Sequence, residues 1–201
     1  MIRVLLAEDQ DLVRGAMTAL LGLEPDIEVV ADVDRGDEVV AAALRTRPQV
    51  ALLDIEMPGG DGISAAAELR RQLPECRVLM LTTFGRPGYL RRAMASGASG
   101  FLLKDAPAAE LAVAIRRTVA GERMVDPQLA AQALSEGDSP LSSREAEVLA
   151  AAVDGASVAE VARRLFLSEG TVRNHLSAAI QKLDARNRME AVRIAQEKGW
   201  L

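Results

Sequence analysis

Short apolar runs alternate with stretches of helical periodicity through residue 121, and this alternation restricts the fold more than any other feature. Each run is bounded by turn residues, which is typical of strands buried on both faces of a parallel sheet. The expected strands are Val4–Ala7, Ile27–Ala31, Val50–Leu53, Val78–Leu81 and Gly100–Leu103. The expected helices span residues 11–22, 36–46, 62–73, 87–96 and 107–120. This order predicts a doubly wound α/β domain, a five-stranded parallel sheet with helices on both faces.

Composition excludes several classes of site. The 201 residues include one cysteine, Cys76, and one histidine, His175. An internal disulfide, a cysteine-based zinc site and a multi-histidine metal site are therefore excluded. No apolar run approaches the roughly 20 residues of a membrane span, and the N-terminus is acidic too early for a signal peptide. We expect a cytoplasmic protein with no membrane partner.

The charge of the chain is unevenly distributed. The net charge of the whole chain is −5, whereas residues 163–201 hold 8 basic and 4 acidic side chains, a net charge of +4. A basic C-terminal end favours an anionic partner, although a charge run is more often a solvated helix face.

The strand pattern stops before Pro140. Residues 122–140 are poor in order signals and are interpreted as a linker between a domain at 1–121 and a second domain at 141–201. Ser142 and Glu145 form the pattern of a capping box, which starts a helix. The expected helices run from there to about Asp154, over Val158–Phe166, over Glu169–Leu183 and from Asn187 to about Lys198. The second domain is therefore expected to be all-α.

Carboxylates gather at the expected carboxyl ends of two strands. Glu8 and Asp9 follow the first strand, and Asp54 ends the third. With the strand order 2-1-3-4-5, the first and third strands are neighbours, so the three acids converge at one crevice. Two unit charges about 4 Å apart repel by roughly 4 kcal/mol at an effective dielectric of about 20, and a bound cation relieves this repulsion. Oxygen ligands in such a cluster suit Mg²⁺.

A hydroxyl and an ammonium are expected at the same edge, from Thr82 and Lys104 at the ends of the fourth and fifth strands. Acids, a metal, a hydroxyl and a lysine together describe a site that binds a phosphoryl group. Each residue alone has a plainer interpretation. Asp54 taken alone fits a cap on the helix that begins near Asp61, and Lys104 taken alone fits a solvated charge. The combination at one edge favours the phosphoryl site.

Residues 1–121 resemble the receiver domain of bacterial two-component response regulators. The resemblance rests on Glu8-Asp9, on Asp54 with Met57-Pro58 and Gly62, and on Thr82, Phe101 and Lys104 in that order. It implies that Asp54 is the phosphoacceptor of a cognate sensor histidine kinase. It also implies that Asp9 and Asp54 bind Mg²⁺ directly, Glu8 binds it through water, and the backbone carbonyl of Glu56 is a further ligand.

The same resemblance implies which residues respond to phosphorylation, as the switch of the domain. Thr82 and Lys104 are implied to contact the phosphoryl oxygens, and Phe101 to change rotamer as Thr82 moves. The loop at Thr83–Gly88 is the expected mobile segment. One departure is Asp105, because many receivers have proline after the lysine, and this leaves the geometry of the Lys104–Asp105 peptide open.

Residues 156–176 have the pattern of a helix, a turn and a second helix. An apolar stripe on the second helix leaves four polar residues outward, namely Arg173, Asn174, Ser177 and Gln181. Such a helix enters a major groove, where arginine reads guanine and asparagine or glutamine reads adenine. Phosphate contacts are expected from Thr171, Lys182, Arg186 and Arg188. The alternative from the pattern alone is a helical protein-docking domain with a solvated basic face.

Residues 141–201 closely resemble the helix-turn-helix domain of the LuxR/NarL type, through Leu141–Glu145, Ser168–His175 and Lys182-Leu183. Three segments are similar to the membrane-fluidity regulators of this family, which control a fatty-acid desaturase, namely Leu81–Phe84, Arg86–Tyr89 and Glu197–Trp200. Together the resemblances imply a DNA-binding transcription regulator rather than an enzyme. Its partners would be double-stranded promoter DNA and a second copy, as a homodimer formed on phosphorylation.

Two alternatives remain open. A phosphorylation-independent transcription regulator is the first. The second is a Mg²⁺-dependent aspartyl phosphatase with Asp54 as nucleophile and Glu56 as general acid, although no substrate cap domain is evident.

Dimer contacts are expected from the first and fifth helices and the last helix of the chain, because apolar residues alternate with polar ones at Leu111, Ile115 and Val119.

Overall fold

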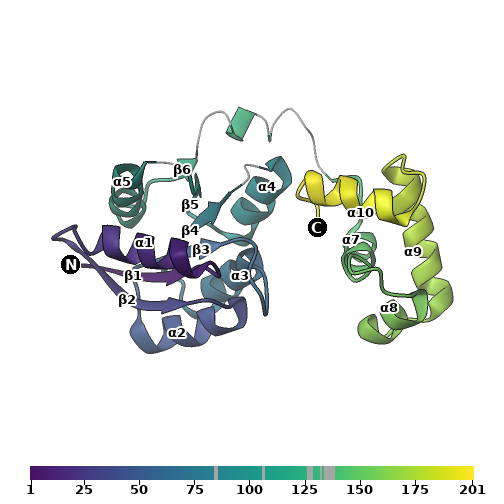
Figure 1. Ribbon diagram of the computed structural model, residues 1–201, viewed down its shortest axis with the longest axis horizontal. Coiled ribbons are helices and arrows are strands. Elements are labelled where there is room, and N and C mark those ends of the chain that lie inside the picture. The colour runs from purple at the N-terminus through teal and green to yellow at the C-terminus, as the bar shows by residue number, and fades with distance from the viewer. Residues whose placement is uncertain (84–85, 106, 126–128, 132, 134–138) are drawn as a thin grey trace. The chain divides into compact units, whose positions relative to one another are not determined.

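A computed structural model describes residues 1–83, 86–105, 107–125, 129–131, 133 and 139–201. The chain forms two compact units, one built mainly from residues 1–131 and the other mainly from residues 132–201. Figure 1 shows the sheet of the first unit in purple to teal and the helices of the second in green to yellow. Two residues of the expected mobile loop, Phe84 and Gly85, lie outside the described residues. In the part of the chain that is described, no helix is both long enough and apolar enough to cross a membrane.

The first unit contains a six-stranded parallel sheet in the order β2-β1-β3-β4-β5-β6. The strands are β1 (Ile2–Ala7), β2 (Ile27–Val33), β3 (Val50–Asp54), β4 (Arg77–Thr82), β5 (Gly100–Leu103) and β6 (Met124–Val125). The predicted order 2-1-3-4-5 is confirmed. Strand β6 was not predicted and lies in the stretch interpreted as linker, because a strand of two residues has no periodic pattern to detect.

Helices cover both faces of this sheet, as predicted. They are α1 (Asp11–Leu21), α2 (Val39–Thr46), α3 (Gly62–Gln72), α4 (Pro87–Ser96) and α5 (Ala108–Val119), with a 3₁₀ turn η1 (Gly36–Glu38) before α2. The helix expected at 36–46 is therefore divided between η1 and α2. Helices α1 and α5 lie on one face, and α2 and α3 lie on the other (Figure 1).

The central strand β3 is buried along its whole length, which explains its uninterrupted apolar sequence. Val50 and Leu52 pack into the core beneath α1 and α5, and the alternation of side chains turns the residues between them to the opposite face. Leu111 and Ile115 are buried in the same core. The stripe that motivated the expected dimer contacts on α5 is therefore the inward face of that helix and does not support them, and the expectation of dimer contacts by α1 and α5 stays a prediction.

Strand β3 ends where its polar residue reaches the carboxyl edge of the sheet. The amide of Gly62 donates to the carbonyl of Ile55 at 2.9 Å, and a Cβ at Gly62 would lie 1.9 Å from the carbonyl oxygen of Asp54. Glycine therefore allows α3 to begin directly against the strand end. Asp61 caps α3, since its Oδ1 accepts from the amide of Ser64 at 2.6 Å. The capping role considered for Asp54 is thus filled by Asp61.

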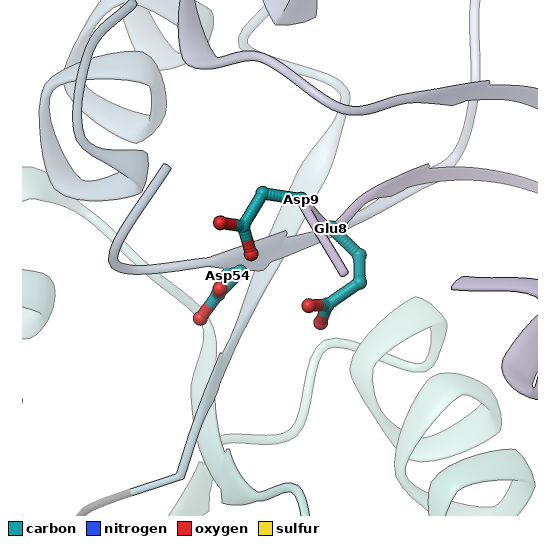
Figure 2. Close-up of side chains that lie close together, drawn as sticks. All are labelled: Glu8, Asp9 and Asp54. Atoms are coloured by element: carbon teal, nitrogen blue, oxygen red, sulfur yellow. The ribbon is translucent and has the colours of Figure 1, made fainter. Parts of the chain in front are cut away.

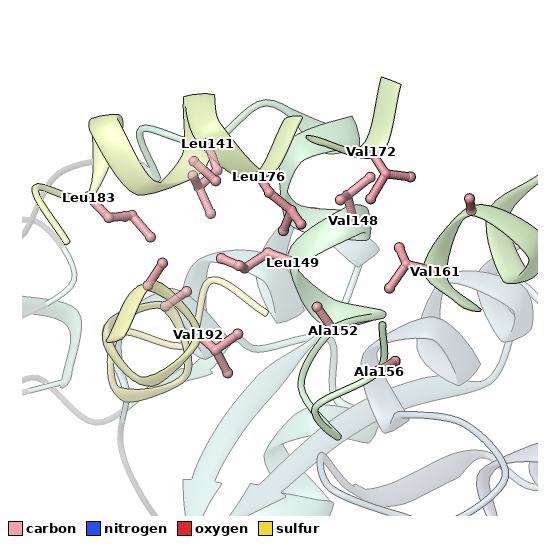
Figure 3. Close-up of a cluster of buried hydrophobic side chains, with 14 residues drawn as sticks. Leu141, Val148, Leu149, Ala152, Ala156, Val161, Val172, Leu176, Leu183 and Val192 are labelled. Atoms are coloured by element: carbon pink, nitrogen blue, oxygen red, sulfur yellow. The ribbon is translucent and has the colours of Figure 1, made fainter. Parts of the chain in front are cut away.

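The second unit is helical and matches the expected helix-turn-helix arrangement. Its helices are α7 (Ser143–Ala150), α8 (Val158–Leu165), α9 (Glu169–Lys182) and α10 (Arg188–Glu197). They enclose a cluster of buried apolar side chains that includes Val148, Leu149, Val172 and Leu176 (Figure 3). The expected caps at Ser142, Ser168 and Asn187 are present, and a second capping box between Ser157 and Glu160 was not predicted.

A buried carboxylate joins α7 to α9. Glu145 is 7% exposed, and its Oε2 accepts from the amide of Ser142 and from Nζ of Lys182, both at 2.7 Å. The ammonium of Lys182, and then the Ser142 amide, hold the pKa of this carboxyl below its ordinary value. Because the Ser142 hydroxyl also accepts from the amide of Glu145, the first turn of α7 depends on one side chain for both its cap and its contact with α9.

Replacing Glu145 by alanine should lower the free energy of unfolding of the helical unit by about 1–3 kcal/mol, because it leaves the Ser142 amide and the Lys182 ammonium without their acceptor. Urea denaturation followed by the fluorescence of Trp200 measures this, since Trp200 packs against the helical core and is the only tryptophan of the chain. Glu147→Ala is the matched control, because Glu147 forms only an exposed pair with Arg144 and should cost about 0.5 kcal/mol or less. Equal losses in the two variants would contradict the structural role of Glu145.

Candidate functional site

Three carboxylates converge at the carboxyl edge of the sheet, next to the neighbouring strands β1 and β3. Glu8 and Asp9 follow β1, and Asp54 is the last residue of β3. An oxygen from each lies within 4.8 Å of one from each of the others, and Figure 2 shows the three side chains around a common region. Glu8 and Asp54 are buried, whereas Asp9 is exposed. The convergence expected from the strand order is therefore present.

The ammonium of Lys104 lies between the two buried carboxylates. Its Nζ is 2.9 Å from Asp54 Oδ2, 2.9 Å from Glu8 Oε1 and 2.7 Å from Glu8 Oε2. Lys104 follows β5, so its side chain reaches across β4 to the acids of β1 and β3. With all four groups ionised, three negative charges and one positive charge leave the cluster at −2.

The hydrogen bonds of the cluster are unevenly shared. Asp54 Oδ1 accepts from the amide of Ile55 at 2.7 Å, and Glu8 Oε1 accepts from the amide of Gln10 at 3.2 Å. Glu8 Oε2 is close to the Lys104 ammonium but accepts no hydrogen bond from the residues that the structure describes, because the angle is unfavourable. A buried anionic oxygen in this state favours a further positive or hydrogen-bonding partner.

Burial dominates the protonation of Asp54. Removal from solvent, together with the weaker effect of the Glu8 charge, raises the pKa of this carboxyl to about 6, against the hydrogen bond and charge of Lys104. For Lys104, burial lowers the pKa, but the hydrogen bonds and charges of Glu8 and Asp54 outweigh it and the pKa is raised. At neutral pH the ammonium is therefore charged and Asp54 is mainly a carboxylate.

A cavity of about 290 Å³ opens beside Asp54 and is lined by Asp9, Gln10, Asp54, Glu56, Thr82 and Thr83. Thr82 is 4% exposed at the end of β4, and its carbonyl accepts from the amide of Lys104 at 2.8 Å. Phe101, on the neighbouring strand, is fully buried. The residues predicted for the site thus come from four strand ends and the loop after β3. The roles predicted for them in phosphoryl binding and switching stay predictions.

The donor set of this cavity fits a hard divalent cation. The acidic cluster at this cavity supplies carboxylate oxygens from Glu8, Asp9 and Asp54, and the buried Glu8 Oε2 accepts no hydrogen bond from the described residues. Small cations such as Mg²⁺ bind through one or two carboxylates and keep several waters, which the cavity volume allows. No peptide bond between described residues is cis, and the Lys104–Asp105 peptide is trans, as expected for a bond that does not precede proline.

The outward face of α9 carries the side chains predicted to read bases. Arg173, Asn174, Ser177 and Gln181 are all exposed. Arg173 forms an i,i+4 ion pair with Glu169 at 2.6 Å. The side chains of the other three have no hydrogen-bond or ion-pair partner within the described chain.

The residues predicted to contact phosphates already have partners within the helical unit. Lys182 is held by the buried Glu145, and Arg186 forms a bidentate pair with Glu190. Arg188 donates to the carbonyls of Ala156 at 2.7 Å and Gly155 at 3.1 Å. The hydroxyls of Thr171 and Ser168 lie 2.8 Å apart. Lys182 and Arg188 therefore stabilise the domain, a role that the sequence pattern did not indicate.

Comparison with known families accounts for both units. Residues 4–116 match the family described as response regulator receiver domain, and residues 139–195 match the family described as bacterial regulatory proteins, luxR family. The predicted resemblances to these two families are confirmed.

Individual relatives match over the whole chain. The transcriptional regulatory protein DesR of Bacillus subtilis (strain 168) is 44% identical over 200 residues, which cover 100% of this chain and 99% of DesR. The uncharacterized transcriptional regulatory protein YvfU of the same strain is 45% identical over 201 residues, covering 100% of both chains. The crystal structure of the response regulator ChrA, from a heme-sensing two-component system, has a TM-score of 0.58 and 35% identity and covers 100% of this chain and 98% of its own.

Asp54→Asn should stabilise the chain at neutral pH when divalent cations are removed with EDTA. Between pH 3.8, the ordinary pKa, and about 6, the folded Asp54 keeps a proton that the unfolded chain releases. The stability of the wild type therefore falls as pH rises through this window. The advantage of the variant should grow over the same range, to at most about 3 kcal/mol.

Urea denaturation followed by circular dichroism at a series of pH values measures this difference. Asp9→Asn is the matched control, because Asp9 is the exposed acid of the cluster, and it should keep the wild-type pH dependence. A constant difference between Asp54→Asn and wild type across the window would show that Asp54 does not titrate there.

Proposed function

Because the chain belongs to the two-component response regulators that join a receiver domain to a LuxR-family helix-turn-helix domain, we propose that phosphorylation of Asp54 controls its binding to promoter DNA. A cognate sensor histidine kinase donates the phosphoryl group, and the cytoplasm is the proposed location. The receiver is assigned to residues 1–121, the linker to 122–140 and the DNA-binding domain to 141–201. The observation that carries the proposal is the buried Asp54 carboxylate, 2.9 Å from the Lys104 ammonium beside the cavity that Thr82 also lines.

In the proposed transfer, a carboxylate oxygen of Asp54 attacks the phosphorus of the kinase phosphohistidine. A P–O bond forms, the P–N bond breaks, and a phosphoimidazole that is protonated on its other ring nitrogen leaves as neutral imidazole, keeping that proton. Lys104 and the Thr82 hydroxyl stabilise the charge on the phosphoryl oxygens. Bound Mg²⁺, held by Asp9, Asp54 and the Glu56 carbonyl with Glu8 acting through water, would neutralise part of this charge.

Phosphorylation changes what surrounds Lys104 and Thr82. The carboxylate with one charge is replaced by a group of about −2 with three acceptor oxygens. Lys104 then exchanges its contact with Asp54 for a phosphoryl oxygen, and Thr82 turns its hydroxyl to another. Phe101, buried on the neighbouring strand, takes up the space that Thr82 leaves. These movements are the proposed switch.

For DNA binding, we assign base reading to the outward face of α9. Arg173 is placed to read guanine, Asn174 and Gln181 to read adenine, and Ser177 to contact either. Phosphate contacts are assigned to Thr171 and Arg186, and to the outward N–H groups of Lys182 and Arg188. The exposure of the four base-reading side chains supports this assignment.

Dimerisation is proposed to use an apolar groove between α1 and α5. This groove has a volume of about 250 Å³, and its lining includes Leu12, Leu20, Leu102 and Leu103. Leu12 is 85% exposed and Leu20 is 43% exposed, and exposed apolar groups of this size favour a protein partner. The last helix, α10, is proposed to contribute further contacts between the two DNA-binding domains.

Incubation with acetyl phosphate and Mg²⁺ distinguishes the proposal from its alternatives. We expect stoichiometric labelling, measured as a mass increase of one phosphoryl group, which Asp54→Asn abolishes and Glu56→Gln does not. Steady turnover of small phosphate esters that requires Glu56 would instead support the aspartyl phosphatase, and absence of labelling would support the phosphorylation-independent regulator.

The labelled samples also test the dimer by light scattering at micromolar concentration. Phosphorylated wild type should be dimeric, and Leu12→Glu should remain monomeric while keeping its label. Leu23→Glu is the control, because Leu23 is exposed and lies outside the groove, and it should leave the dimer intact. Ile2 would not serve as a control position, because its side chain is half-buried. A phosphorylated wild type that stays monomeric would contradict this part of the proposal.

Arg173→Ala should relax the base preference of the protein, costing about 1–3 kcal/mol at one position of the site with little change on non-specific DNA. Lys182→Ala should weaken binding to all sequences and reduce the salt slope by about 1. Fluorescence anisotropy with specific and scrambled duplexes at several salt concentrations measures both effects.

Arg144→Ala is the control for the loss of one arginine, because Arg144 lies on α7 in an exposed pair with Glu147. It should leave the preference unchanged. Equal loss on specific and scrambled DNA in Arg173→Ala would count against base reading. For Lys182→Ala, the Trp200 denaturation profile separates lost phosphate contact from the lost Glu145 pair.

A further inference from the structure

Three arginines meet at the amino edge of the sheet, opposite to the phosphoacceptor. Arg77 begins β4, Arg70 lies near the end of α3, and Arg123 directly precedes β6. All three line a cavity of about 270 Å³. Strand β4 rises about 17 Å from Arg77 to Thr82, and this distance separates the cavity from the edge that carries Asp54.

The positive charge of this cavity has no internal counter-charge. Within the part of the chain that the structure describes, Arg70, Arg77 and Arg123 form no ion pair and their side chains make no hydrogen bond. The acidic residue of the lining, Glu122, is already paired with Arg117 at 2.7 Å. Three positive charges and one negative charge leave a local excess of +2 on a chain whose net charge is −5.

The backbone around the cavity is shaped to accept one of these guanidinium groups. Gly97 has a φ of +96°, and a Cβ there would lie 2.4 Å from Cδ and 2.6 Å from Nη1 of Arg70. Only glycine therefore lets the Arg70 side chain lie against this turn. Ser99, also in the lining, adds a hydroxyl. The turn after α4 thus holds Arg70 next to the cavity rather than leaving it free in solvent.

We propose that this cavity binds a small phosphate-bearing anion of at least two negative charges, of the pyrophosphate class. Guanidinium groups match phosphate oxygens with two parallel hydrogen bonds each. The cavity volume equals that of about nine water molecules in the liquid. This is more than one phosphate group needs, and it accommodates two phosphate groups that share an oxygen. Free pyrophosphate and the diphosphate of a nucleotide share this chemistry.

Isothermal titration of the full chain with sodium pyrophosphate, in EDTA and at constant ionic strength, tests the site. EDTA prevents a cation at the Asp54 cluster from recruiting the ligand there. We expect saturable binding of one pyrophosphate per chain. Arg70→Gln, Arg77→Gln and Arg123→Gln should each weaken it by about tenfold or more, which is the effect of losing one charge-assisted contact.

Arg71→Gln is the matched control, because Arg71 is the next residue of α3, pairs with Glu68 and lies outside the cavity lining. It should keep the wild-type affinity. Gly97→Ala, which displaces Arg70 without changing the charge, should weaken binding as well. Because the three arginines are exposed, we expect each variant to fold, and circular dichroism verifies this.

Parallel titrations with inorganic phosphate and ADP separate the sources of the ligand. Equal affinity for ADP and pyrophosphate, with weaker binding of phosphate, supports recognition of the diphosphate alone, and tighter binding of ADP supports a nucleotide. No saturable binding at millimolar pyrophosphate would overturn the proposal. Equal loss in Arg71→Gln and Arg70→Gln, or binding that survives removal of all three arginines, would overturn it too.

Discussion

The contact of the Lys104 ammonium with both Glu8 and Asp54 is the interaction on which the acidic edge of the sheet depends. Glu8 is fully buried and Asp54 is 5% exposed, and two carboxylates this close in a site with little solvent repel each other strongly. Lys104 offsets this repulsion with contacts of 2.7–2.9 Å to both. Because the three groups come from the ends of β1, β3 and β5, their pairing requires the order of strands that the sheet has. The charge balance of the site and the topology of the sheet therefore stabilise each other.

Much of this edge could be predicted because buried parallel strands have uninterrupted apolar sequences. Once the strand order is assumed, Glu8, Asp9, Asp54, Thr82 and Lys104 must meet, and all five do lie at one edge. Strand β6 escaped prediction because its two residues carry no period. This omission does not concern the site itself.

The partners of the basic residues could not be predicted, because these contacts join residues that are far apart in the sequence. Lys182 and Glu145 are 37 residues apart, and Arg188 reaches a carbonyl 32 residues away. A basic residue near a recognition helix has the same sequence signature whether it contacts DNA or stabilises the domain. The arginines of the cavity at the amino edge of the sheet come from α3, from β4 and from the segment before β6, and they share no motif. Only packing brings such groups together, so a count of charges along the chain is a poor guide to their partners.

The pairing of Lys104 before phosphorylation also limits the energy of the proposed switch. Moving a two-state equilibrium from about 1:99 to about 99:1 requires roughly 5.5 kcal/mol of differential interaction. A lysine that was free beforehand would contribute its whole contact with the phosphoryl group, but Lys104 already has two carboxylate partners. Phosphorylation therefore contributes only the difference between the new contact and the one it replaces, plus the hydroxyl bond of Thr82. Hydrogen bonds to charged groups contribute about 1.5–3 kcal/mol each, so exchange of one and gain of one fall short of the requirement. We propose that association of two copies supplies the remainder, which makes burial of the exposed leucines of α1 a part of the switch rather than its consequence.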